Sequence, residues 1–128
     1  RVTSRRKSRV SSQRKSTVKA SLGDLTSLPR RHQAMIDRYV FDVAALAAEV
    51  KRLLKPGGTA TMVVGNSTLK GIFIKNSAAV SKALELQGLS FLSETVRDLP
   101  SNSRYLPTAL GSTLANRMRE ETILKLVA

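Results

Sequence analysis

Apolar residues recur at helical spacing along the stretch that begins near residue 30. The repeating positions are Ile36, Val40, Val43, Ala47, Val50 and Leu54. This period places them on one face of a helix. Pro29 suits the start of that helix, because the N–H that proline lacks would have no partner there. Pro56 disfavours helical geometry at the residue before it, and the glycines that follow permit a turn. The pattern predicts a helix over 30–54, with a candidate break near Asp42.

A short apolar run follows this turn at residues 59–64, with the sequence Thr-Ala-Thr-Met-Val-Val. Its β-branched and nearly continuous apolar character is typical of a buried strand that is covered on both faces. A helix, a tight glycine turn and a buried strand together form half of a βαβ unit. The pattern therefore favours an α/β fold.

Three further segments of the chain show a pattern. Residues 79–87 are apolar at helical spacing before Gly88, with Asn76 or Ser77 as the candidate N-cap. Residues 89–96 and 122–127 have the composition of strands. The secondary structure of two stretches is undecided from the pattern. Residues 71–75 fit an extended segment or a helix entry, and residues 114–121 fit a helix or an irregular segment.

Charge divides the chain near residue 27. The 128 residues carry 22 Lys and Arg against 9 Asp and Glu, a formal net charge of +13. Up to Lys19 there is no acidic residue at all. Such a segment buries too little apolar surface to offset the entropy lost on ordering. We therefore expect a flexible basic arm over 1–27 and a folded domain over 28–128.

The cations of this arm suit phosphate groups, because each one that neutralises a phosphate releases a counterion. The candidate nucleic-acid-binding residues are Arg5, Arg6, Lys7, Arg9, Arg14, Lys15 and Lys19. A solvated tail explains the same composition equally well.

Composition excludes several kinds of site. The chain has no Cys and a single His, which excludes a disulfide scaffold, a Cys nucleophile, and metal sites built from thiolates or clustered histidines. It has no Gly-x-Gly-x-x-Gly phosphate loop, and no catalytic set of residues can be assembled. No apolar run approaches the roughly 20 residues that span a bilayer. No signal peptide is present, so we expect a cytoplasmic protein without a membrane partner.

Polar residues follow the strand at 59–64, where open α/β sheets bind ligands. Asn66 offers an amide donor and acceptor, and Ser67 offers a hydroxyl. Farther along, Arg104 and Tyr105 pair a planar cation with an aromatic ring, which suits phosphate contact or base stacking. These four residues are the candidate substrate-binding residues. The competing interpretations are a turn with a helix cap for the first pair and an ordinary loop for the second.

The order of these motifs resembles the second half of a class I S-adenosylmethionine-dependent methyltransferase, over residues 30–128. The matching stretches are Arg38-Tyr39 through Glu49, Leu53-Leu54-Lys55-Pro56-Gly57-Gly58 and Val63-Val64-Gly65-Asn66-Ser67. Three features resemble the DNA-modification methylases more narrowly: Gly-Asn-Ser after the strand, Arg104-Tyr105-Leu106-Pro107, and Met118-Arg119-Glu120-Glu121.

This resemblance implies half of a Rossmann-like methyltransferase sheet. Residues 59–64, 89–96 and 122–127 would be its fifth, sixth and seventh strands, with flanking helices and the last strand antiparallel. The implied cofactor of the parent enzyme is S-adenosylmethionine, and the implied substrate is a nucleic-acid base, in DNA ahead of RNA. The family's glycine-rich cofactor loop and its Pro-Pro catalytic motif are both absent from this chain. The chain therefore resembles the carboxyl-terminal half of such an enzyme, and alone we expect it to bind no cofactor and to be inactive.

A fifth strand without its fourth-strand neighbour would leave an open sheet edge. We therefore expect the chain to pair with a missing amino-terminal half or to associate with itself through that edge. The alternative function is a non-enzymatic, basic nucleic-acid-binding protein with a small α/β domain. The missing motifs favour the alternative for this chain, and the detailed match favours a methyltransferase origin.

Overall fold

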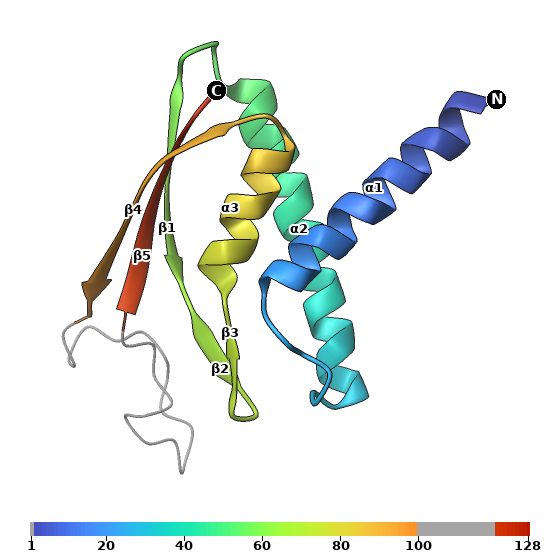
Figure 1. Cartoon of the computed structure of the whole chain (residues 1–128), viewed down its shortest axis with the longest axis vertical. Coiled ribbons are helices and arrows are strands. Elements are labelled where there is room, and N and C mark those ends of the chain that lie inside the picture. The colour runs from blue at the N-terminus through green and yellow to red at the C-terminus, as the bar shows by residue number, and fades with distance from the viewer. Residues whose placement is uncertain (1, 100–119) are drawn as a thin grey trace.

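The computed structural model describes residues 2–99 and 120–128, with side chains from residue 12 onward. Within these ranges it is a mixed α/β structure (Figure 1). The helices are α1 (Val2–Ser21), α2 (Arg30–Leu53) and α3 (Asn76–Leu86). The strands are β1 (Thr59–Gly65), β2 (Ser67–Leu69), β3 (Ile72–Ile74), β4 (Ser90–Asp98) and β5 (Glu120–Val127).

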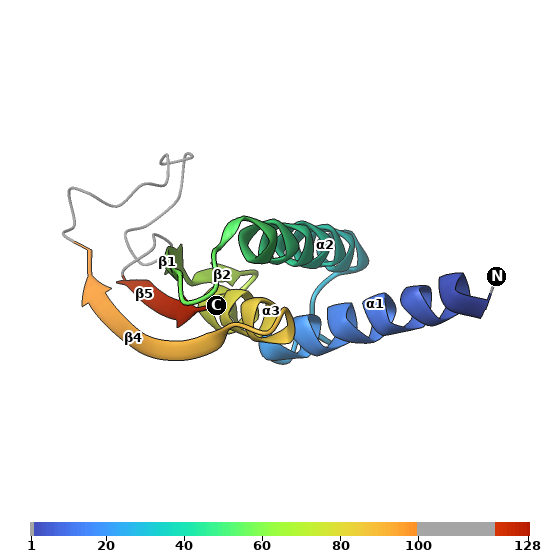
Figure 2. The same ribbon diagram turned by 90° about the horizontal axis from the view of Figure 1, so that it is seen from above.

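The main sheet has the strand order β1-β5-β4. Strand β5 is antiparallel to both neighbours, so β1 and β4 run parallel to each other and α3 is the crossover between them. All three helices lie on the same side of the sheet, with α3 next to the strands and α1 and α2 beyond it (Figure 2). The core between α3 and the sheet contains Leu84, Leu124 and Leu126, which are at most 1% exposed.

The predicted elements of the folded part are confirmed at the level of type and place. Helix α2 occupies the predicted 30–54 stretch without a break at Asp42, and α3 follows the predicted cap region. Strands β1, β4 and β5 lie where strands were expected, and the last one is antiparallel as the resemblance implied. The ambiguous segment 71–75 is extended, because it forms β3 of a hairpin with β2. Lys70 and Gly71 both have positive φ, as a two-residue hairpin turn requires.

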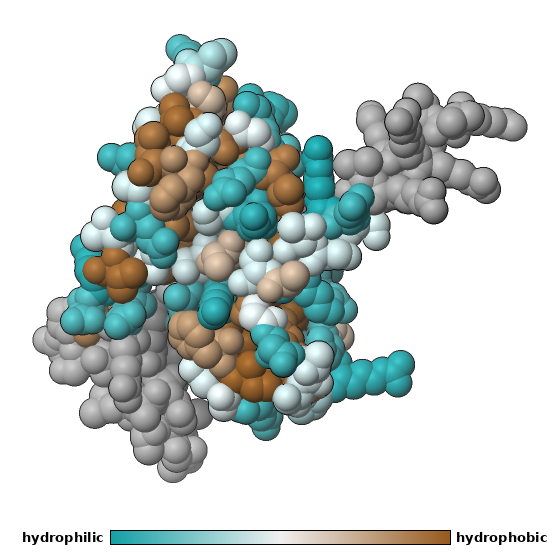
Figure 3. Space-filling view, viewed as in Figure 1, coloured by the Kyte–Doolittle hydropathy of each residue, from teal (hydrophilic) through white to brown (hydrophobic). Residues whose placement is uncertain are grey.

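One expectation for β1 is wrong for the described residues, because the strand is covered on one face only. Ala60, on the side of α3, is 8% exposed, whereas Val63 on the opposite face is 58% exposed. All the described helices lie on one side of the sheet. The described residues therefore bury the apolar side chains of β1 on that face and leave the other face exposed. Apolar surface is accordingly visible along the strand side of the molecule (Figure 3).

The glycine turn after α2 also holds the last residue of the chain. Gly57 has φ +78°, and a Cβ on Gly58 would lie 2.9 Å from the carbonyl oxygen of Lys55. The N–H of Ala128 donates to the carbonyl of Gly58 at 2.8 Å, and the N–H of Gly57 donates to the carbonyl of Ala128 at 3.1 Å. The turn thereby connects α2, β1 and β5 at one end of the sheet.

The basic segment differs most from its expectation. A flexible arm was predicted over 1–27, and the structure has helix α1 there, followed by a packed connection. Val18 is 1% exposed and Leu22 0% exposed, and the N–H of Lys75 donates to the carbonyl of Leu22 at 3.0 Å. The physical reason is local, because a few apolar residues at the end of the segment enter the core although its average composition is polar.

The connection from α1 to α2 contains a further turn. The Oδ1 atom of Asp24 accepts hydrogen bonds from the N–H of Thr26 at 3.0 Å and from its hydroxyl at 2.7 Å. These two bonds hold the pKa of the Asp24 carboxyl below its usual value. Leu25 within this turn and Leu28 after it are buried, so the connection is part of the core.

Replacing a buried residue of this segment tests its packing. We expect Leu22→Ala to lower the free energy of unfolding by about 2–5 kcal/mol, because it leaves a cavity at a fully buried site. The exposed position Ser16 on α1 provides the control, and Ser16→Ala should stay within about 0.5 kcal/mol of the parent. Urea denaturation followed by circular dichroism measures both. Equal stability of all three proteins would instead support the flexible arm.

Candidate functional site

The carboxyl end of β1 meets the first turn of α3 through two asparagines. The Oδ1 atom of Asn66 accepts from the backbone N–H of Ser77 at 3.0 Å and from its hydroxyl at 3.1 Å. In return, Nδ2 of Asn76 donates to the carbonyl of Gly65 at 2.9 Å and to Oγ of Ser67 at 3.1 Å. Four hydrogen bonds therefore join the strand end to the helix.

This arrangement arises because α3 has no cap from its own flanking residues. The N-cap position is Lys75, whose side chain makes no capping hydrogen bond. The first N–H groups of a helix lack intrahelical acceptors, and Asn66 supplies one from across the β2–β3 hairpin. The prediction that Asn76 or Ser77 is the N-cap of α3 is thus wrong. Ser77 instead donates both of its bonds to Asn66 and is 7% exposed.

The network changes what Asn66 and Ser67 can offer a ligand. The Asn66 oxygen already accepts two hydrogen bonds, which leaves its Nδ2 group as the free polar group of that side chain. Ser67 accepts from Asn76 and keeps a hydroxyl proton to donate. The geometry thereby supports the turn-and-cap interpretation of these two residues. Their role in substrate binding stays a prediction, and Arg104 and Tyr105 lie outside the described residues.

Sequence reasoning missed Asn76 and Ser77 as partners of Asn66 and Ser67. A signal was present, because the dipeptide Asn-Ser at 66–67 is repeated ten positions later at 76–77, on the other side of the segment that forms the hairpin. The hairpin brings the two copies together, and each asparagine bonds to the other copy.

The candidate nucleic-acid-binding residues of α1 differ in their surroundings. Arg14 is exposed, whereas Nζ of Lys15 lies 4.6 Å from the ring centre of Phe41 on α2. Nζ of Lys19 pairs with Asp37 of α2 at 2.6 Å. Lys15 and Lys19 therefore also serve the contact between α1 and α2. Arg5, Arg6, Lys7 and Arg9 lie on the part of α1 whose side chains are not described.

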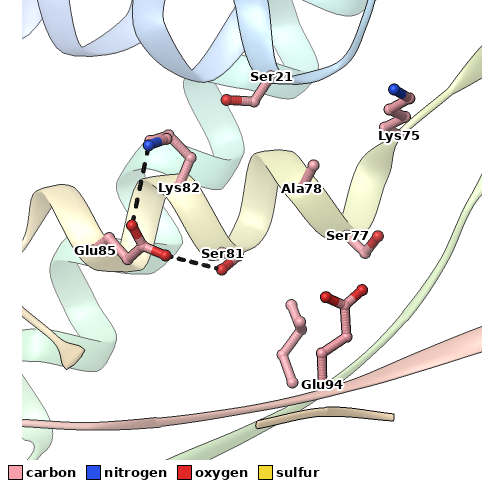
Figure 4. A pocket seen from close by; sticks show the side chains of 9 residues that line it. Ser21, Lys75, Ser77, Ala78, Ser81, Lys82, Glu85 and Glu94 are labelled. Atoms are coloured by element: carbon pink, nitrogen blue, oxygen red, sulfur yellow. Dashed lines mark hydrogen bonds and ion pairs between the residues drawn. The ribbon is translucent and has the colours of Figure 1, made fainter. Parts of the chain in front are cut away.

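A pocket of about 380 Å³ lies between α3, the end of α1 and the sheet (Figure 4). Its lining consists of Ser21, Lys75, Ser77, Ala78, Ser81, Lys82, Glu85, Glu94 and Leu124. Glu85 pairs with Lys82 at 4.0 Å and accepts from the hydroxyl of Ser81 at 3.4 Å. These polar groups are therefore partly paired with one another, and among the predicted site residues whose side chains the structure describes, none lines the pocket.

Two acidic residues of α2 form exposed ion pairs within the helix. Asp42 pairs with Arg38 at 3.4 Å and Glu49 with Arg52 at 2.7 Å, and all four side chains are well exposed. Over the described ranges, no three His, Asp or Glu side chains lie close enough to hold a metal ion. In the same ranges, no helix is long and apolar enough to cross a membrane.

Two substitutions at Asn66 separate its structural role from other roles. Asn66→Ala should lower the free energy of unfolding by about 1–2 kcal/mol, because a first-turn N–H of α3 loses its acceptor. Asn66→Asp should retain most of the stability, since a carboxylate accepts the same bonds and faces the positive end of the helix dipole. Thermal denaturation of both variants measures this. Equal melting temperatures for Asn66→Ala and the parent would contradict the capping role.

The fold is similar to that of solved methylase structures. A crystal structure of a candidate DNA modification methylase from Thermus thermophilus, a selenomethionine derivative, matches with TM-score 0.53 and 24% identity over 77% of this chain. The same methylase complexed with S-adenosyl-L-methionine matches with TM-score 0.51 and 24% identity over 73% of this chain. No protein-family model and no curated protein matches the sequence.

The match spans only part of the methylase, 41% of the chain in the first structure and 39% in the second. More than half of the methylase thus has no counterpart in the matched region. The likeness is one of fold, and it shows that residues of this chain adopt a methyltransferase-like arrangement of helices and strands.

Proposed function

We propose that this chain is the carboxyl-terminal portion of a cytoplasmic methyltransferase that transfers a methyl group from S-adenosylmethionine to a nucleic-acid base, in DNA ahead of RNA. The observation that carries the proposal is the strand order β1-β5-β4 with an antiparallel β5, in a fold similar to a candidate DNA modification methylase. The complex of that methylase with S-adenosyl-L-methionine supports the choice of cofactor.

Under this proposal, β1, β4 and β5 are the fifth, sixth and seventh strands of a Rossmann-like sheet. Helices α2 and α3 are the flanking helices of one face. The crossover through α3 and the insertion of β5 between two parallel strands both support this assignment.

The described residues do not fit S-adenosylmethionine as a ligand of this chain alone. They contain no glycine-rich loop, and the polar groups at the end of β1 are mostly bonded to α3. The remainder of the parent enzyme would therefore hold the cofactor, which supplies the methyl group.

The contribution of this chain would be to position the methyl acceptor. In the proposed enzyme, Nδ2 of Asn66 and the hydroxyl of Ser67 border the acceptor pocket at the end of β1. The resemblance assigns Arg104 and Tyr105, which lie outside the described residues, to the same role. A base within a duplex must first leave the stack to reach such a pocket. Fixing the reacting groups in one geometry is a major source of rate enhancement in group transfer, so the fixed strand end favours this role.

Helix α1 supplies the proposed contact with the phosphate backbone. It carries seven Lys and Arg and no acidic residue over Val2–Ser21, and its amino-terminal part points away from the body of the molecule (Figure 2). Val18 and Leu22 hold its other end in the core. The proposed phosphate contact therefore involves the amino-terminal part of the helix, in which Arg5, Arg6, Lys7 and Arg9 lie.

We expect the chain to bind a 20-base-pair duplex in a salt-dependent manner. Residues 1–14 contain six cations, so the slope of log K against log[salt] should reach at most about −5 if each meets a phosphate. Replacing Arg5, Arg6, Lys7 and Arg9 together by Gln should flatten the slope by about 3 or less. Fluorescence anisotropy over a salt series measures this.

A charge-matched control distinguishes the effect of the α1 cations on binding from the effect of total net charge. Gln at the exposed positions Arg30, Arg31, Lys51 and Lys55 removes the same four charges from α2 and its end. This variant should keep the slope of the parent within about one unit. Equal effects of the two quadruple variants would mean that α1 has no special role in binding.

The isolated chain should bind no S-adenosylmethionine in calorimetry at high cofactor concentration, since it lacks the glycine loop. A micromolar dissociation constant would show that this chain contains a cofactor site. It would contradict the proposal that the remainder of the parent enzyme holds the cofactor.

The alternative function is a non-enzymatic nucleic-acid-binding protein with a small α/β domain. The basic α1 and the absence of the cofactor and Pro-Pro motifs favour it for this chain. A longer reading frame that encodes both motifs would decide for the methyltransferase.

A further inference from the structure

Phe41 is an exposed aromatic side chain on the side of α2 that meets α1. It is 51% exposed, whereas Val40 and Val43 beside it on the helix are buried in the core at 3% and 6%. Nζ of Lys15 on α1 lies 4.6 Å from the centre of the Phe41 ring. The ring is therefore outside the core, is close to a cation, and keeps about half of its surface open to solvent.

On α2 the ring lies between an acidic and a basic residue. Asp37 is about 40° around the helix from Phe41 on one side, and Arg38 is about 60° around it on the other. Lys19 of α1 pairs with Asp37 at 2.6 Å. The Arg38 side chain is 78% exposed and pairs with Asp42 at 3.4 Å. Exposed pairs of this kind are weak, so the Arg38 guanidinium is available to an anionic ligand.

On α1 a second cation accompanies Lys15. Arg14 is exposed and directly precedes Lys15 in the sequence. Within the part of the chain whose side chains are described, neither of them forms an ion pair with an acidic residue. The surroundings of Phe41 thus contain more cations than carboxylates.

An exposed aromatic ring among cations suits an unpaired nucleotide. The flat face of any base stacks on an aromatic side chain, while a positively charged surface binds the phosphates of the strand. A base within a duplex is covered above and below by its neighbours, so its flat face is closed to a protein ring. An acidic peptide would pair with the cations, but it does not supply a flat surface beside each charge. The combination of ring and cations therefore favours a single strand.

We propose that Phe41 is a stacking site for an unpaired base of single-stranded DNA, and that Arg14, Lys15 and Arg38 bind the phosphates beside that base. The base takes the open part of the ring, and the Lys15 ammonium group lies close enough to the ring to meet a phosphate of the same strand. The inference rests on the proposed binding of nucleic acid by α1. It adds that the bound strand is unpaired where it meets α2.

A tryptophan at position 41 reports stacking directly. The chain has no Trp, so Phe41→Trp introduces a single indole, whose fluorescence a stacked base quenches. An oligo-dT of about 12 nucleotides should quench it in proportion to the binding that anisotropy measures. Phe91→Trp on β4, at a side chain that is 46% exposed, is the control and should show no quenching. Binding without quenching at position 41, equal quenching at both positions, or no binding of oligo-dT would overturn the proposal.

An alanine at the same position distinguishes stacking from charge. Phe41→Ala should weaken the binding of oligo-dT at least about fivefold, which is the lower end of the contribution of one stacked base. It should leave the slope of log K against log[salt] unchanged, because no cation is removed. Phe91→Ala should leave the affinity for oligo-dT unchanged. Equal weakening of oligo-dT and duplex binding by Phe41→Ala would mean that the ring only supports α1, and would overturn the proposal.

Two further measurements separate the source of the strand and the two proposals. Quenching at position 41 by an oligo-U of the same length, without quenching by oligo-dT, would overturn the assignment to DNA. Quenching by oligo-dT without salt-dependent binding of a duplex would support the stacking site and contradict the proposed phosphate contact of α1. Salt-dependent duplex binding without quenching by oligo-dT would do the reverse.

Discussion

The antiparallel insertion of β5 between β1 and β4 is the contact on which the described fold depends. Strand β5 pairs with both neighbours along its length and buries Thr122, Leu124 and Leu126 against α3. Ala128, the residue after the strand, is hydrogen-bonded to the glycine turn that follows α2. Because β1 and β4 do not touch, every backbone hydrogen bond that unites the sheet passes through β5. The closing strand, last in sequence, thus joins elements that are far apart in the chain.

Long periodic segments could be predicted from the sequence because local pattern determines them. The helical period of apolar residues extends along α2, and β1, β4 and β5 have strand composition, with turn residues on both sides of β1 and β4. Helix α1 could not be predicted, because Val18 and Leu22 are few among the eight cations of residues 1–27, and their burial depends on α2 and α3 being in place. The average composition of a segment does not show that two of its apolar residues are buried by helices elsewhere in the fold.

The hydrogen bonds of the candidate site were also beyond prediction from the sequence. Asn66 and Ser67 were identifiable by their position after a strand, but their bonding partners depend on the β2–β3 hairpin. That hairpin returns the chain to the strand end, so Asn76 and Ser77 meet residues ten positions earlier. Once these bonds are counted, much of the polar capacity at the site supports the fold, and Nδ2 of Asn66 and the hydroxyl proton of Ser67 are the donors that these two side chains keep for a ligand.

Helix α1 has a packed carboxyl-terminal end and a basic amino-terminal part. A helix of 20 residues is about 30 Å long, and among its described side chains Val18, near the carboxyl-terminal end, reaches the core. The exposed ion pair between Lys19 and Asp37 adds little stability, so Val18 and Leu22 must set the direction of the helix. A cation on a helix held at one end loses less freedom on meeting a phosphate than a cation on a free chain. If α1 binds a nucleic acid as proposed, its packed end would therefore strengthen that binding without contacting the nucleic acid itself.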